Sequence, residues 1–101
     1  MKKVDYIQAL TEEDKVRISF TQDRGKILKF TVQYFALIKD RWRTIMRIDN
    51  CHGYPHQHVR HLHAEEFRVP LDKDTNLAFT EAQKYIANEF KKIKENFIFS
   101  R

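Results

Sequence analysis

All five histidines of this 101-residue chain lie in one stretch, "DNCHGYPHQHVRHLH" at residues 49–63. Arg60 lies inside the stretch, and Arg47 stands two positions before it. Histidine exchanges protons near neutral pH because its unperturbed pKa is about 6.5. Cleavage of RNA needs a base for the 2′-hydroxyl, an acid for the leaving oxygen and a cation for the charge that develops on the phosphate. The stretch and its flank therefore contain the residue types for metal-independent RNA cleavage.

The spacing of these residues assigns roles to them. If residues 56–60 are extended, His56, His58 and Arg60 share one face, because side chains two positions apart point the same way. Arg47 and Asp49 likewise share a face of the strand before them, so pairing of the two segments would bring both sets together. We expect Arg47 to hold the scissile phosphate and Asp49 to orient a histidine. The predicted catalytic residues are His56, His58, Arg47, Asp49 and His52.

Two other interpretations of the histidines stay open. His56 and His58 can present two imidazoles to one transition-metal ion, with nearby Asp, Cys or His side chains completing the set. Structural zinc sites are usually rich in thiolates, whereas Cys51 is the only cysteine here. The histidines can also be surface or core-edge residues without a chemical role. We predict no cofactor and assign no metal ligands.

Alternating runs before this stretch predict β-strands. In residues 16–21, Val16, Ile18 and Phe20 alternate with polar residues, which is the two-residue period of a half-buried strand. The next two runs place apolar side chains on one face at Leu28, Phe30, Val32, Tyr34, Ala36 and Ile38, and at Trp42, Thr44, Met46 and Ile48. A turn at Gly25 and the "KDR" segment separate the runs. The three strands predict an antiparallel meander.

The two ends of the chain complete an expected α+β domain spanning residues 1–101. Val4, Ile7 and Leu10 have the spacing of a short helix, and "FRVPL" at residues 67–71 has the alternation of an edge strand. From Thr80 onward the period becomes helical, and "TEAQ" is typical of a capping box. We therefore predict an antiparallel meander of three to four strands with a C-terminal amphipathic helix on one face.

The other face of the predicted sheet is polar and basic, and we call it the open face. It carries Arg17, Lys29, Arg43 and Arg47 on the expected pairing, and the chain has a net charge of +5. Such a face is either merely solvated or binds a polyanion. Trp42 and Tyr54 have the chemistry to stack on bases, although Trp42 falls in register with the expected core. The predicted nucleic-acid contacts are Arg17, Lys29, Arg43, Arg60 and Tyr54.

Composition limits the setting of the protein. A hydrophobic share of 42% is enough for a core in a chain of this length. A single cysteine predicts a reducing compartment, and we find neither a signal peptide nor an apolar run long enough to span a membrane. We predict a cytoplasmic protein without a membrane partner. The sequence does not predict an oligomeric state.

The motif "RIDNCHGYPHQH" at residues 47–58 resembles the central motif of the TumE-type toxins of prokaryotic toxin–antitoxin pairs and of related small proteins. There a strand ending in Arg-aromatic-Asp-Asn is followed by a histidine-containing loop and a Pro-His-x-His element. Ile48 stands at the aromatic position. The positions that match are Arg47, Asp49, Asn50, His52, Pro55, His56 and His58. The resemblance implies a prokaryotic, cytoplasmic protein that cleaves RNA and is neutralised by an antitoxin.

The sequence thus predicts a small metal-independent ribonuclease and leaves two alternatives. One is a module that binds nucleic acid or protein on the basic sheet face without turnover. The other is a metal-binding protein that uses the histidines.

Overall fold

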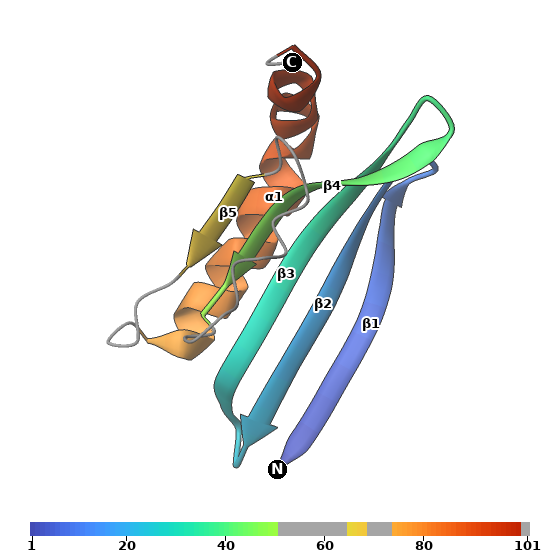
Figure 1. Ribbon diagram of the computed structural model, residues 1–101. Coiled ribbons are helices and arrows are strands. Elements are labelled where there is room, and N and C mark those ends of the chain that lie inside the picture. Colours follow the sequence, from blue (N-terminus) through green and yellow to red (C-terminus); the bar gives the residue numbers. More distant parts are fainter. Residues whose placement is uncertain (51–64, 69–73, 100–101) are drawn as a thin grey trace.

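The computed structural model describes residues 1–50, 65–68 and 74–99 (Figure 1). Its elements are β1 (Lys2–Thr11), β2 (Asp14–Asp23), β3 (Lys26–Ile38), β4 (Arg41–Asp49), β5 (Glu65–Arg68) and α1 (Thr75–Phe99). The strands form one sheet in the order β1-β2-β3-β4-β5. Neighbours among β1 to β4 are antiparallel, whereas β5 runs parallel to β4. The predicted α+β architecture, an antiparallel sheet with a C-terminal helix, is confirmed.

The core lies between α1 and one face of the sheet, which we call the helix face. Val32 and Tyr34 of β3 and Ile86 of α1 are fully buried there. The ring of Phe79 lies 5.0 Å from that of Phe20 and 5.3 Å from that of Phe30, centroid to centroid. Because α1 packs on β3 and β4, β1 forms the edge of the sheet that lies away from the helix (Figure 1). The opposite face is the open face of the described residues.

Two tight turns fix the register of the central strands. Asp23 pairs with Lys26 across Arg24 and Gly25, whose φ angles are 52° and 80°. Lys39 and Asp40, with φ of 52° and 64°, make the second two-residue turn between β3 and β4. Positive φ at both central residues is the geometry whose twist matches that of the flanking strands. The turns predicted at these two places are confirmed.

The N-terminal segment is a strand, so its helix-like spacing was misleading. In β1, Val4 pairs with Phe20 and faces the core side, whereas Ile7 pairs with Arg17 on the open face and is 59% exposed. An irregularity between Ala9 and Thr11 leaves Leu10 as the extra residue. Pairing with β2 outweighs the weak helical period, because backbone groups of β2 gain hydrogen-bond partners on a second side.

A β-bulge in β4 overturns part of the predicted face assignment. Tyr34 pairs with Met46 but Phe35 pairs with Thr44, so Ile45 is an extra residue. One extra residue inverts the alternation before it. Trp42, expected in the core, therefore lies on the open face and is 42% exposed, while Ile45 is buried.

A second bulge inverts the predicted faces at the start of β3. Thr21 pairs with Lys29 and Gln22 pairs with Ile27, which leaves Leu28 as the extra residue. The predicted core position at Leu28 is wrong, because Leu28 is 40% exposed and Ile27 is buried.

The C-terminal helix begins five residues before its predicted start. Asp74 Oδ1 accepts a hydrogen bond from the backbone N of Leu77 at 3.2 Å, as expected of an N-cap. The capping box predicted at Thr80 is wrong, since Thr80 lies within the helix and its Oγ1 donates to the carbonyl of Asn76. The helical period predicted from Thr80 onward is confirmed, with Ala82, Ile86, Ile93 and Phe97 buried on one side of the helix. No described helix is long and apolar enough to cross a membrane.

The short strand β5 changes the expected environment of Arg47 and Asp49. It overlaps the strand predicted around Phe67, but it is parallel to its neighbour rather than part of the meander. Residues 46–49 of β4 thus have β3 on one side and β5 on the other. This leaves no free edge for the pairing that the sequence predicted between these residues and residues 56–60, which lie outside the described part of the chain.

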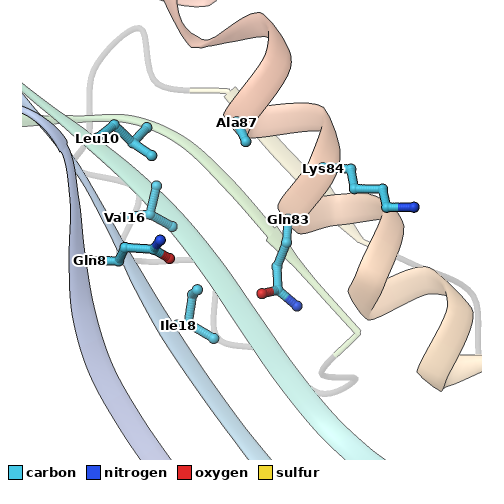
Figure 2. A pocket seen from close by; sticks show the side chains of 7 residues that line it. All are labelled: Gln8, Leu10, Val16, Ile18, Gln83, Lys84 and Ala87. Atoms are coloured by element: carbon cyan, nitrogen blue, oxygen red, sulfur yellow. The ribbon is translucent and has the colours of Figure 1, made fainter.

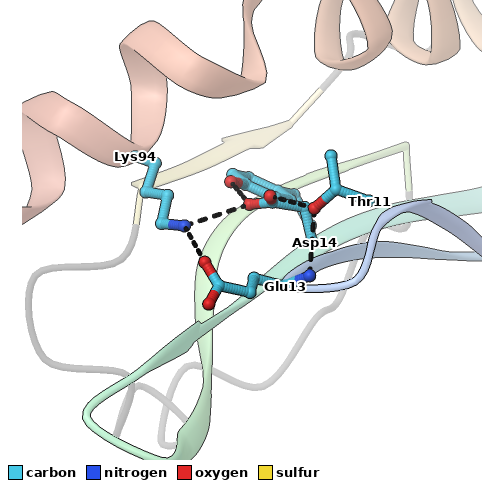
Figure 3. Close-up of polar contacts among 5 residues, drawn as sticks. Thr11, Glu13, Asp14 and Lys94 are labelled. Carbon is cyan, nitrogen blue, oxygen red and sulfur yellow. Dashed lines mark hydrogen bonds and ion pairs between the residues drawn. The ribbon is translucent and has the colours of Figure 1, made fainter.

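A buried polar cluster ties the β1–β2 turn to β3 (Figure 3). Asp14, only 5% exposed, accepts hydrogen bonds of 2.6 Å from Thr11 Oγ1 and from Tyr34 Oη. Lys94 Nζ of α1 lies 3.6 Å from Asp14 Oδ1 and 3.9 Å from Glu13 Oε1. Burial and the hydrogen bond to Asp14 both raise the pKa of Tyr34, so the phenol stays protonated and donates. The carboxylate buried in this cluster is therefore paired and hydrogen-bonded, as buried charges must be.

Two asparagines take the place of a neighbouring strand where β4 has ended. Asn50 Oδ1 accepts from the backbone N of Phe30 at 2.8 Å, and its Nδ2 donates to the carbonyl of Leu28 at 3.1 Å. Asn76 accepts from the backbone N of Ile27 and donates to the carbonyl of Gly25 in the same manner. The backbone groups of β3 beyond its last pair with β4 thereby have hydrogen-bond partners. Asn50, a position of the toxin-like motif, is thus a structural residue here.

Replacement of Asn50 tests this arrangement. We expect Asn50→Ala to lower the free energy of unfolding by about 1–3 kcal/mol, because buried backbone groups of β3 lose their partner. Urea unfolding followed by circular dichroism measures the loss. Asn88→Ala on the exposed side of α1 is the matched control, and we expect it to stay within about 0.5 kcal/mol of wild type. An Asn50→Ala variant with the wild-type midpoint would contradict the structural role.

Candidate nucleic-acid interface on the open sheet face

The open face consists of cross-strand rows of polar side chains. Arg17 of β2, Gln33 of β3 and Arg47 of β4 are register partners across three strands. The next row joins Ser19, Thr31 and Asp49. Directly opposite residues lie about 5 Å apart at Cβ, so Arg17 and Arg47 stand on either side of Gln33. Two cations with hydroxyl and amide donors between them can bind the oxygens of a phosphate.

These two rows form a hollow of about 290 Å³. Its lining residues are Arg17, Ser19, Thr31, Gln33 and Arg47. The side chain of Gln33 is held by a hydrogen bond of 3.0 Å from its Nε2 to Thr44 Oγ1. The Gln33 side chain therefore enters the hollow in a defined orientation.

Arg47 is held by the nearly buried carboxylate of Asp49. Arg47 Nε lies 3.3 Å from Asp49 Oδ2, and the two side chains are 21% and 5% exposed. Both stand at odd positions after the Ile45 bulge, so both face the open side, as the sequence predicted. Asp49 here orients a guanidinium. The histidine that it was expected to orient lies outside the described residues, so that role stays a prediction.

Arg17 is held by Asp5 of β1. Arg17 Nε donates to Asp5 Oδ1 at 3.0 Å and Nη2 donates to Oδ2 at 2.7 Å. The hydrogen bond from Arg17 lowers the pKa of Asp5, and the same bond raises the pKa of Arg17. Because the pKa of Asp5 is lowered, the pair persists at neutral pH and is lost only as the pH falls through that lowered value. Any anion that binds Arg17 must compete with this carboxylate.

The other predicted cations divide between the two faces. Lys29 is exposed and pairs with Thr21, next to the two rows on the open face. The predicted position of Arg43 on the open face is wrong, because the Ile45 bulge moves it to the helix face, where it pairs with Ala36. Its guanidinium carbon lies 5.7 Å from the ring centroid of Phe97 in α1. Arg43 is therefore no part of a basic open face.

The same bulge adds an aromatic cluster to the open face that the sequence did not predict. Lys15 Nζ lies 4.0 Å from the ring centroid of Trp42 and 5.8 Å from that of Phe35. A cation–π contact at an exposed site is worth about 0.5–1 kcal/mol. The signal that could have identified this cluster is the adjacent pair Ile45-Met46, two large apolar residues in a row where strict alternation requires a polar one.

Several predicted site residues lie outside the described residues. They are His52, Tyr54, His56, His58 and Arg60. Within residues 1–50, 65–68 and 74–99, no group of three or more His, Cys, Asp or Glu side chains is arranged to hold a metal ion. The described part of the site consists of two arginines with hydroxyl and amide side chains between them, near partly exposed aromatic rings.

A second hollow, of about 210 Å³, lies beside α1 on the helix face (Figure 2). Figure 2 shows Gln83 of α1 pointing toward the strands, with Leu10, Val16 and Ile18 opposite. This hollow exists because α1 packs on β3 and β4 and leaves part of β1 and β2 beside it. Its lining residues include one cation, Lys84, and no carboxylate, so we keep the open face as the candidate site.

The fold and site define a small α+β domain with a cationic, partly aromatic face on its sheet. Residues 1–100 match one protein family, described as a domain of unknown function (DUF7718), and the chain belongs to that family. Neither the curated proteins nor the solved structures contain a match to it. The family description names no activity, so the resemblance to TumE-type toxins stays a prediction.

Removal of the carboxylate that competes for Arg17 tests whether the open face binds anions. We expect Asp5→Asn to raise the affinity for heparin about two- to fivefold, since an exposed ion pair is weak and is replaced by contact with the polyanion. Elution from a heparin column against salt, followed by titration, measures the change. Glu81→Gln on the exposed side of α1 makes the same change in net charge away from the open face. Equal gains from both variants would refute a specific role of the open face.

Proposed function

We propose that this protein binds RNA on its open sheet face and cleaves it without a metal, with His56 and His58 as acid and base. The observation that carries the proposal is the hollow between Arg17 and Arg47, which joins two guanidinium groups, two hydroxyls and an amide. Arg47 is two residues before the segment that contains every histidine of the chain. A phosphate bound at Arg47 would thus lie close in sequence to the groups that transfer protons.

The chemistry follows from these roles. One histidine removes the proton of a 2′-hydroxyl, whose oxygen attacks the adjacent phosphorus and forms a 2′,3′-cyclic phosphate. The other histidine protonates the 5′-oxygen as its bond to phosphorus breaks, so no oxidant, metal or further reactant is needed. Arg47 stabilises the charge that develops on the non-bridging oxygens. Asp49 keeps the guanidinium of Arg47 in place, and His52 is a further proton-transfer candidate.

The cellular setting of this proposal comes from the resemblance to TumE-type toxins. An RNA-cleaving protein of this kind would act in the cytoplasm of a prokaryote and would be inactivated by an antitoxin. An antitoxin that covered the open face would block substrate and active site together.

Binding without cleavage is the second candidate. The observation that favours it is that the described strands β2, β3 and β4 by themselves line the hollow with two arginines, two hydroxyl residues and an amide residue. A binding module of this kind needs only the cations and the aromatic cluster.

Cleavage of a mixed-sequence labelled RNA by tag-free protein tests the proposal. We expect cleavage that persists in EDTA and yields 2′,3′-cyclic phosphate ends. His56→Ala and His58→Ala should each lower the rate about 100-fold or more, because each removes a proton-transfer group. Arg47→Ala should weaken both cleavage and binding.

His63→Ala is the matched control, since it removes a histidine to which the proposal gives no role. All variants are purified in parallel with the wild type, because contaminating ribonuclease imitates activity. RNA binding without cleavage by any variant would favour the binding module, and cleavage abolished by EDTA would favour a metal site at the histidines.

A further inference from the structure

The open face contains an aromatic cluster whose largest ring is partly exposed. Trp42 is 42% exposed, although a large apolar side chain gains most when it is buried. Phe35 is half-buried in the row next to it, and Lys15 Nζ lies 4.0 Å from the centre of the Trp42 ring. The open face thus presents one indole, one phenyl ring and one ammonium group together.

The position of this cluster relative to the phosphate hollow fits a single-stranded nucleic acid. Phe35 stands two positions after Gln33 on β3, and Leu37, the register partner of Trp42, stands four positions after it. At about 3.4 Å per residue these steps are about 7 and 14 Å along the sheet. A short single strand whose phosphate lies between Arg17 and Arg47 can therefore extend a neighbouring base to the rings.

We propose that Trp42, flanked by Phe35, is a base-stacking subsite for single-stranded RNA. The proposal rests on the proposed function and adds to it the contact that distinguishes a nucleic acid from other polyanions. Stacking on an aromatic ring is tolerant of sequence, because every base has a π-face. The face would thus bind RNA strands of varied sequence.

Lys15 makes the subsite responsive to its ligand. Its ammonium covers the Trp42 ring through a weak cation–π contact. A base that stacks on the ring displaces this ammonium, which is then close enough to pair with a phosphate of the same strand. The ammonium of Lys15 thus contacts the Trp42 ring in the free protein and a phosphate in the complex.

Fluorescence of Trp42 provides a direct test, since Trp42 is the only tryptophan of the chain. The probe is a short 2′-O-methyl RNA oligonucleotide, which lacks the hydroxyl needed for cleavage, and inorganic polyphosphate is the ligand without bases. We expect the oligonucleotide to quench the fluorescence of Trp42 on binding, and polyphosphate to leave it nearly unchanged.

Affinities of variants complete the test, measured by anisotropy of the labelled oligonucleotide and by its competition with polyphosphate. Trp42→Ala should weaken oligonucleotide binding about 5- to 100-fold, since each stacked base contributes substantially to affinity. Its affinity for polyphosphate should change less than about twofold, because stacking contributes nothing there. Trp42→Phe, which keeps an aromatic ring and guards against loss of folding, should retain most of the affinity.

The outcomes separate this proposal from the proposed function. Oligonucleotide binding that neither quenches Trp42 nor weakens in Trp42→Ala overturns the subsite and leaves RNA binding intact. Quenching by polyphosphate to the same extent also overturns it, because the signal then reports only the displacement of Lys15. If the protein binds neither the oligonucleotide nor polyphosphate, the proposed function is overturned together with the subsite.

Discussion

The single extra residue at Ile45 determines what each face of this protein can do. Side chains of a strand alternate strictly, so one inserted residue inverts the faces of everything before it. After the bulge, Arg47 and Asp49 lie on the open face and Met46 and Ile48 on the helix face. Before it, Trp42 is on the open face and Arg43 packs near the helix. The composition of the candidate RNA-binding face depends on this one irregularity.

Within the described residues, one helix packs on a five-stranded sheet, which explains why one face of the sheet is polar. Helix α1 can bury only one side of the sheet, and it packs on β3 and β4. Cations of the central strands then favour the opposite side, because an unpaired buried charge is costly, and Arg43 on the helix face is only partly buried, near the ring of Phe97. The exceptions on the buried side are satisfied individually. Asp14 accepts two hydrogen bonds, and Asn50 and Asn76 bond the backbone of β3.

The sequence predicted those parts of the fold whose local signals agree with one another. Alternation in β2 and the helical period around Ile86 were strong, and the turn at Gly25 was marked by residue type. The sequence-based prediction failed at Leu28 and Trp42. Leu28 lies in a β-bulge and Trp42 lies beyond one, where the alternation of apolar residues indicates the wrong face of the sheet, and no single residue marks a bulge. It also failed at Ile7, whose helical spacing is outweighed by strand pairing. Arg47 and Asp49 were placed on the correct face because both follow the bulge.

The pairing of Arg17 with Asp5 and of Arg47 with Asp49 affects which anions the open face prefers. Asp5 and Asp49 reduce the net positive charge of the open face, so the face is a weaker attractor of anions than its cations alone imply. The same carboxylates hold the guanidinium groups in fixed positions, which lowers the conformational entropy lost on binding. A diffuse polyanion gains little from that preorganisation. A phosphate that accepts hydrogen bonds from both arginines gains from it fully, so the ion pairs favour ligands of defined geometry over mere negative charge.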